Sequence, residues 1–213
     1  MKNCIKPILI LLLTVTNSIS RTSQENMYTK PKLIGNCEGC EAIFEHDLTK
    51  LNSVDTLPDF NNKGPKIKIT GTVYKPGGKE PAPNVVLYVY HTNQRGIYPT
   101  KGDEKGWEKR HGYIRGWIKT DANGKYAFYT LKPGIYPSRK TPAHIHLTIL
   151  EPNGKYYWLH SYHFDGDPLL TAKERSTESP RGGSTGIIYL RKQGNLLEGH
   201  RDIELGKNIP GYE

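Results

Sequence analysis

The 213-residue sequence has few cysteines and no apolar run long enough to cross a membrane. Its longest apolar run, residues 8–15 with a single threonine, falls short of the about 20 residues that span a bilayer. Two lysines precede this run and the small residues Ser18 and Ser20 follow it, a pattern typical of a secretory signal peptide. We therefore expect residues 1–20 to be cleaved near Ser20 and the mature protein to be secreted or periplasmic, without stable membrane insertion. A retained anchor is the alternative.

Beyond that segment only two cysteines remain, Cys37 and Cys40. In an oxidising compartment, two cysteines at this spacing are expected to form a local disulfide or to remain an inert thiol pair. A redox role would require a βαβ pattern around them, which the sequence lacks. A zinc site would need two further ligands, and the only nearby candidates are Glu38, Glu41 and His46.

The sequence also lacks concentrated charge. Lys and Arg number 30 against 21 Asp and Glu, a formal net charge of +9, but the basic residues are scattered. Neither a Lys/Arg-rich run nor a helix suited to reading DNA can be recognised. This argues against nucleic acid as a partner and favours a solvated basic surface, with attraction of anionic small molecules as the alternative.

No amphipathic helix of ordinary length and no internal repeat follows residue 66. Short runs of strand-forming residues alternate instead with turn residues. The expected strands are 67–74, 85–90, 112–120, 125–131, 141–150, 156–164 and 187–190. We predict an all-β protein with a single β-sandwich domain over residues 66–213, which ends in a loop-rich tail. An irregular N-terminal arm, residues 21–65, precedes it, with a short helical piece over residues 41–51.

The predicted strand 141–150 carries two histidines on one face. Side chains alternate along a strand, so the apolar residues point into a core while His144 and His146 point the other way as a chelating pair. Tyr98 and Tyr136 each lie in a loop at a strand end. Two phenolates and two imidazoles would stabilise ferric iron better than zinc, which prefers thiolate and imidazole.

Several sequence blocks together carry a family resemblance. They are 90–98 (YHTNQRGIY), 115–121 (RGWIKTD), 133–137 (PGIYP), 142–146 (PAHIH) and 164–167 (FDGD). Their order and spacing resemble those of the intradiol ring-cleavage dioxygenases, the protocatechuate and catechol dioxygenase family. The resemblance extends over residues 66–167, most of the predicted domain.

The resemblance implies a β-sandwich that holds one non-haem Fe(III). Tyr98, Tyr136, His144 and His146 would be the metal ligands and the catalytic residues, with Tyr136 as the phenolate displaced when a catechol binds. The substrates would be a catechol and O2. Cleavage between the two hydroxylated carbons would give a muconate-type diacid, as expected of an oxidoreductase of aromatic compound catabolism.

Two positions depart from the family pattern. The family's arginine directly before Pro-Ala-His is Thr141 here, and Arg139 is the candidate substitute; a glutamine of the family aligns with Ser161. Arg139, Thr141 and Ser161 are thus the candidate substrate-binding residues. The helical dimerisation region of catechol 1,2-dioxygenases has no counterpart, so the oligomeric state stays open, as does the preferred catechol.

Other residues near these blocks have two interpretations each. His91 either hydrogen-bonds beneath the ligand-bearing loop or lies on the surface. His160 and His163 either line the pocket or are ordinary strand residues. Trp107, in the charged loop 101–110, either caps an aromatic substrate or belongs to a solvated loop.

Two alternative functions remain. The strand plan around residues 120–126 (TDANGKY) also resembles transthyretin-like and carboxypeptidase-regulatory-like sandwiches, which are non-catalytic binding modules. Such a module would have no use for two tyrosines and two histidines in this order. A dioxygenase relative that binds iron but turns over weakly is the second alternative, favoured by Thr141 and Ser161.

Overall fold

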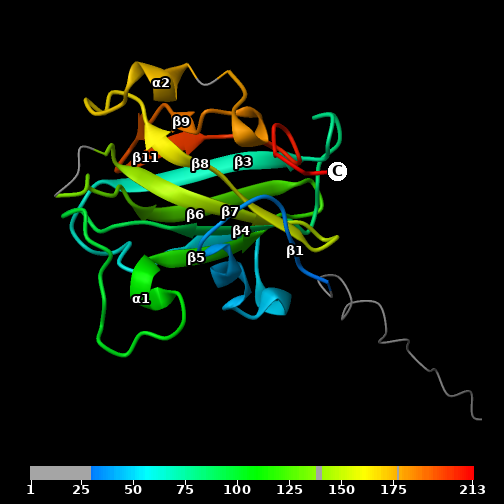
Figure 1. The fold of residues 1–213 in the computed structure, drawn as a ribbon. Coiled ribbons are helices and arrows are strands. Elements are labelled where there is room, and N and C mark those ends of the chain that lie inside the picture. The colour runs from blue at the N-terminus through cyan, green and yellow to red at the C-terminus, as the bar shows by residue number, and fades with distance from the viewer. Residues whose placement is uncertain (1–29, 138–140, 177) are drawn as a thin grey trace, which may run out of the picture.

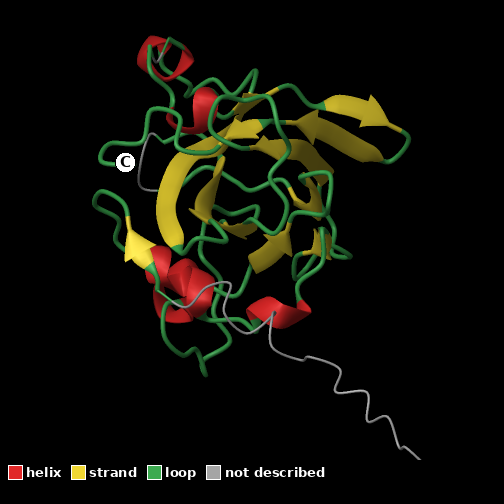
Figure 2. Ribbon diagram, turned by 90° about the vertical axis from the view of Figure 1, so that its right-hand side faces the viewer, coloured by secondary structure: helices red, strands yellow, loops and turns green. Residues whose placement is uncertain are grey.

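The computed structural model describes residues 30–137, 141–176 and 178–213, which form two six-stranded β-sheets packed face to face (Figure 1). The first sheet has the order β1-β8-β7-β4-β5, with β9 paired to β8. The second has the order β10-β11-β3-β6-β2, with β12 paired to β3. Figure 2 shows the short helical segments at the periphery of the strands. The predicted all-β sandwich is confirmed.

The strands of the first sheet are β1 (Lys32–Leu33), β4 (Val86–Tyr90), β5 (Arg115–Lys119), β7 (His144–Leu150), β8 (Lys155–Phe164) and β9 (Ile187–Ile188). Those of the second are β2 (Val54–Thr56), β3 (Lys66–Tyr74), β6 (Lys125–Leu131), β10 (Arg191–Gln193), β11 (Leu196–His200) and β12 (Ile203–Glu204). The helical segments are η1 (Cys40–Phe44), η2 (Leu48–Lys50), α1 (Glu108–His111), α2 (Ala172–Arg175) and η3 (Arg181–Gly183). Among the described residues, no helix has the length and apolar character needed to cross a membrane.

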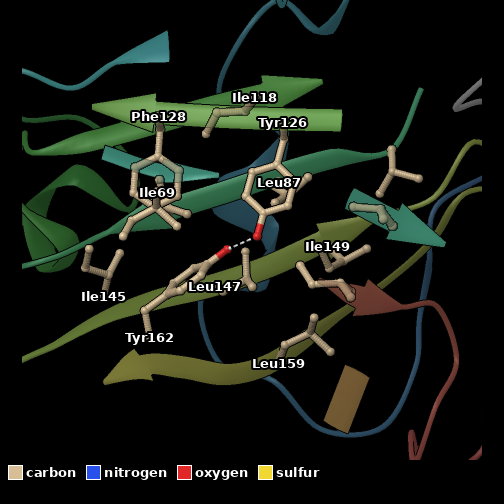
Figure 3. Packing of buried hydrophobic residues seen from close by; sticks show 14 of the residues in the cluster. Ile69, Leu87, Ile118, Tyr126, Phe128, Ile145, Leu147, Ile149, Leu159 and Tyr162 are labelled. Atoms are coloured by element: carbon tan, nitrogen blue, oxygen red, sulfur yellow. Dashed lines mark hydrogen bonds between the residues drawn. The ribbon is translucent and has the colours of Figure 1, made fainter. Parts of the chain in front are cut away.

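The main core lies between the two sheets, where alternate residues of each strand point inward (Figure 3). Leu147 of β7 and Phe128 of β6 are both buried there. Two buried tyrosines satisfy their hydroxyls inside the core: the oxygens of Tyr126 and Tyr162 are 2.9 Å apart, and Tyr126 donates to the carbonyl of Arg201 at 2.6 Å. Both buried hydroxyls are therefore hydrogen-bonded and not desolvated without partners.

The N-terminal arm covers the outer face of the first sheet. Its segment η1 buries Ala42 and Ile43 in a second, smaller apolar cluster against β4, β7 and β8. Two tryptophans of the sheet hold the arm through their indole N–H groups: Trp117 donates to the carbonyl of Ile43 and Trp158 to that of Asn36, both at 3.0 Å. The arm thus lies over the face of the sheet that carries His144 and His146.

The two arm cysteines are joined by a disulfide, Cys37–Cys40, one of the two states expected from the sequence. The segments η1 and η2 fall almost entirely within the predicted helical piece, residues 41–51. The predicted signal peptide, residues 1–20, lies outside the described residues.

Candidate active site

Strand β7 presents both histidines on the outer face of the first sheet. Ile145 and Leu147 are 0% and 2% exposed and point into the core, so the alternation predicted from the sequence is confirmed. The Nδ1 atom of His144 hydrogen-bonds to the carbonyl of Pro142 at 2.8 Å. The buried Asp167 accepts the backbone N–H of Ala143 at 2.9 Å, which fixes the start of the strand.

A register shift marks the pairing of β7 with β8 opposite His146. Ile145 pairs with Tyr162 and Leu147 with Leu159, so β8 contains one more residue than β7 over this interval. Such a bulge increases the local twist and redirects side chains, and it is common beside active sites. Here it brings His160 and Ser161 to the same cleft as His146.

Close contact between two loops brings the tyrosines together. Gly96, two residues before Tyr98, has φ +74, and a Cβ there would lie 1.7 Å from the carbonyl oxygen of Ile135, next to Tyr136. A Cβ on Gly134 would lie 2.3 Å from the carbonyl oxygen of Gln94. Only glycine permits this backbone approach, because any other residue adds a Cβ in occupied space. The glycines therefore place both phenols over β7.

The four predicted donor side chains converge on one point. The Tyr98 oxygen is 2.5 Å from the Tyr136 oxygen and 2.9 Å from Nε2 of His146. The Tyr136 oxygen is 3.2 Å from Nε2 of His144 and 3.5 Å from Nε2 of His146. The two Nε2 atoms are 3.1 Å apart. Five of the six pairs among these four donor atoms, which come from three separate segments, are thus 3.5 Å or less apart.

The surroundings of this cluster suit a cation of high charge. Burial lowers the pKa of His144, and that of His146 well below its usual value, so both imidazoles are neutral at physiological pH, the form in which histidine binds a metal. Burial, together with the hydrogen bond to Tyr136, raises the pKa of the Tyr98 phenol. A buried phenol ionises only beside a strong positive charge, so the donor set fits a trivalent metal better than a divalent one.

Carboxylates and thiols contribute little to this cluster. Within the described segments, no group of three or more His, Cys, Asp and Glu side chains is placed to hold a metal. The convergence is evident only when the two phenol oxygens are counted as donors. A search for the commonest ligand types would therefore overlook the site.

Two clefts flank the cluster. The larger, about 510 Å³, extends from His146 between β8 and the arm, and Ser161, His163 and Glu174 line it. The smaller, about 230 Å³, is lined by Tyr98, Tyr136, His146, Tyr90, Glu38, Trp107, Arg110 and His111. Both clefts reach Tyr90 and His146, so each gives access to the donor cluster. The larger one falls within the size range typical of small-molecule sites.

The other predicted residues are placed as follows. Trp107 lines the smaller cleft, and His160, Ser161 and His163 line the larger one. Thr141 is half-buried and lines neither cleft. Arg139 lies outside the described residues.

Several site residues were missed by the sequence analysis. Tyr90 stacks on His146, His111 stacks on the other face of Tyr90, and Glu38 of the arm reaches the same cleft. Glu45 joins the arm to the domain: it accepts the N–H of Trp107 at 2.7 Å and pairs with Arg115 at 2.6 Å. The place of Tyr90 at the start of the block 90–98 was the one available sequence signal.

His91 is buried beneath the loop that carries Tyr98, and the surface interpretation is wrong. Its Nε2 lies 2.8 Å from the hydroxyl of Thr130 and its Nδ1 lies 2.7 Å from the carbonyl of Thr92. The carbonyl can only accept, so Nδ1 carries the proton and Nε2 accepts from Thr130. Burial lowers the pKa of His91 from 6.5 to about 4, so the side chain is a neutral structural element.

This burial predicts acid sensitivity. The unfolded chain takes up the His91 proton near pH 6.5 and the folded chain only near pH 4, so stability is lost as pH falls through this interval. The full loss of unfolding free energy expected from His91 over this interval is about 3 kcal/mol. Urea unfolding should show a smaller difference in unfolding free energy between pH 7 and pH 4.5 for His91→Gln than for the wild type. The exposed His200→Gln is the control and should keep the wild-type difference.

Comparison with known proteins gives the class of this domain. The sequence model of the family described as Dioxygenase matches residues 41–181, more than half of the chain. The protocatechuate 3,4-dioxygenase beta chain of Burkholderia cepacia is 31% identical over 165 residues, 73% of this chain and 67% of that relative. Catechol 1,2-dioxygenase 1 of Acinetobacter lwoffii is 32% identical over 136 residues, 56% of this chain and 42% of that relative.

Solved structures share the fold at lower identity. The dioxygenase domain of a dioxygenase carbohydrate-binding protein fusion from Streptomyces sp. SirexAA-E has a TM-score of 0.53 at 23% identity, covering 73% of this chain and 90% of that one. Catechol 1,2-dioxygenase from Acinetobacter sp. ADP1 has a TM-score of 0.54 at 18% identity, covering 83% of this chain and 60% of that one. The chain belongs to the intradiol ring-cleavage dioxygenase family. That family acts on catechol substrates with O2.

Proposed function

We propose that this protein cleaves a catechol ring between its two hydroxylated carbons with O2, giving a muconate-type diacid. In this proposal Tyr98, Tyr136, His144 and His146 hold one ferric ion. The observation that carries it is the convergence of their donor atoms, each within 3.5 Å of at least two others, at the meeting point of two clefts. A non-catalytic binding module would have no use for such a cluster.

Bound ferric iron would act as a Lewis acid that lowers the pKa values of the catechol hydroxyls and makes the ring reactive toward O2. The protein supplies the positions and the proton acceptor. Tyr98 and Tyr136 lie in loops, whereas His144 and His146 are fixed in a strand, so the phenols are the donors best able to move, and the family resemblance assigns that part to Tyr136. We assign to its phenol oxygen one of the two protons that a catechol gives up on binding, and the other proton to solvent.

The walls of the smaller cleft suit a planar aromatic substrate. Trp107 contributes a ring surface beside the donor cluster, and Tyr90, whose two faces are covered by His111 and His146, contributes its ring edge. Around the larger cleft, His163 packs against His144 with ring centroids 5.8 Å apart, which closes one side of the cluster. These side chains would exclude water from the reacting ring and limit its orientation.

The first test of the proposal is spectroscopic. Protein loaded with ferric iron should be coloured, with a broad visible tyrosinate-to-iron charge-transfer band, and should consume O2 with catechol, protocatechuate or hydroxyquinol. With ¹⁸O2, both oxygen atoms should enter the diacid product. Protein that stays colourless after ferric reconstitution would favour a binding module. Coloured protein without O2 uptake would favour an iron-binding relative with weak turnover, consistent with Thr141 lying outside the clefts.

Secretion is a separate proposal, because it rests on residues 1–20 of the sequence alone. Cleavage near Ser20 would leave the arm, with its Cys37–Cys40 disulfide, as the N-terminal part of the mature protein. An oxidising compartment is where such a disulfide persists. Mass spectrometry of the secreted protein would locate the cleavage site.

A further inference from the structure

A column of stacked aromatic rings ends at one of the four donor residues. The rings of Tyr90 and His146 are nearly parallel, with centroids 4.4 Å apart and planes inclined by 11°. On the other side of Tyr90, the ring of His111 stacks at 3.8 Å and 8°. Trp107 continues the series at 5.4 Å and 25° from His111. The column therefore runs from the α1 segment, across β4, to β7.

Strand register builds the inner half of this column. Tyr90 and His146 are directly paired residues of the antiparallel strands β4 and β7, so their side chains stand next to each other on the outer face. His111 reaches Tyr90 from the end of α1. Its Nδ1 lies 2.8 Å from the hydroxyl of the buried Tyr88, which fixes the plane of the ring.

The arm fills the space on the outer side of the His111 ring. A Cβ on Gly39, which has φ +86, would lie 2.7 Å from Nε2 of His111 and 3.3 Å from the ring of Trp107. The disulfide-closed turn at residues 37–40 thus packs directly against the column. The rings are held between the arm and the sheet.

The two imidazoles of the cluster are oriented by different means. Metal-binding histidines usually donate their second ring N–H to a carbonyl or carboxylate, which fixes the ring plane. His144 follows this rule through Pro142, with Nδ1 2.8 Å from the carbonyl. His146 forms no hydrogen bond through Nδ1 with any residue in the described part of the chain, and its polar contacts there all involve Nε2. Its remaining restraint is the face of Tyr90.

We propose that Tyr90 and His111 are positioning residues that hold the His146 imidazole in its ligand orientation by stacking, in place of a hydrogen bond. This role rests on the proposed function, because it assumes that His146 binds the metal. The stacked ring prevents rotation about the Cβ–ring bond, so Nε2 stays directed at the phenol oxygens. Loss of the aromatic face would release this rotation and misdirect Nε2.

The test compares Tyr90→Leu, which removes the ring, with Tyr90→Phe, which keeps it. In the metal-free protein, NMR should show nuclear Overhauser contacts between the His146 ring and the ring of Tyr98, whose hydroxyl lies 2.9 Å from Nε2, in the wild type and in Tyr90→Phe. These contacts should be lost in Tyr90→Leu, because the released imidazole turns Nε2 away from the phenol. The leucine variant should bind ferric iron about 10- to 100-fold more weakly, the range seen when ligand-orienting groups are removed. Its charge-transfer band should move, and Tyr90→Phe should restore both properties.

Tyr156→Leu is the matched control. Tyr156 is also a buried tyrosine under the arm, packed edge-on against Phe44 at 5.1 Å, and it lies outside the column. Its replacement should lower stability and leave the iron affinity and the band unchanged. Unchanged iron affinity and spectrum in Tyr90→Leu would overturn the positioning role. If the wild type takes up no iron, the proposed function fails, and the metal-free NMR comparison still decides whether Tyr90 orients His146.

Discussion

Replacing Tyr136 by phenylalanine is expected to lower kcat/KM for a catechol by about 10³-fold, equivalent to about 4 kcal/mol of barrier. The substitution keeps the ring, which packs 6.0 Å from the Tyr98 ring and 5.2 Å from that of His144. It removes the oxygen that lies 2.5 Å from the Tyr98 oxygen and 3.2 Å from Nε2 of His144. In the proposed function one metal donor and one proton acceptor would be lost together, so iron content, colour and turnover should fall while the fold is kept.

Steady-state O2 uptake, iron analysis and thermal unfolding of the same samples would measure these effects. Tyr113→Phe is the control, because its hydroxyl donates to Asp59 at 2.7 Å outside the donor cluster. That variant should keep turnover within about twofold. If Tyr136→Phe retained more than about a tenth of wild-type turnover, the assignment of Tyr136 as donor and proton acceptor would be wrong.

The donor residues could be predicted because their spacing is local. A histidine pair on a strand needs only period-two alternation, and β7 keeps that alternation through His144 and His146. The tyrosines were singled out because each lies in a loop at a strand end, within a block that carries the family resemblance. Their convergence could not be derived from the residues alone, because it depends on two loops meeting across more than thirty residues of sequence.

Most of the fold also followed from local pattern. The expected strands 67–74, 125–131 and 156–164 correspond to β3, β6 and β8 within one residue. Four of the missed strands, β1, β2, β10 and β12, have only two or three residues and so carry no periodicity; the five-residue β11 was missed as well. β1 and β12 exist only through parallel pairing with β8 and β3, a tertiary contact that no local sequence pattern reports.

The role of the arm was the feature that the sequence predicted least well. Its polar composition indicated an irregular appendage, yet Ala42 and Ile43 of η1 are fully buried on the outer face of the first sheet. A 3₁₀ segment of five residues is too short to show an apolar stripe. Because β4, β7 and β8 carry aromatic residues on that outer face, the sheet requires a cover, and the arm supplies it together with one wall of both clefts.

Gly96→Ala tests how the two ligand loops meet, and its expected effect is large. Alanine at φ +74 costs about 1–2 kcal/mol of backbone strain. Its Cβ would also lie 1.7 Å from the carbonyl oxygen of Ile135. Because that oxygen belongs to the backbone, the clash is relieved only if the loop moves. The loops should therefore separate by an ångström or more, taking Tyr98 away from Tyr136. A displacement of that size is expected to lower turnover on the order of 10²-fold.

Gly211→Ala is the control that separates the effect of backbone strain from the effect of moving the loop. Gly211 has φ +71, almost the same backbone conformation, and no atom lies within 4 Å of a Cβ built there. It should lose about 1–2 kcal/mol of stability and keep its iron, its visible band and its turnover. Gly96→Ala should show the same strain together with loss of the band, because the donor atoms no longer converge. Equal turnover in the two variants would mean that the Gly96 contact does not set the distance between the two phenols, and that the loops are positioned by β7 alone.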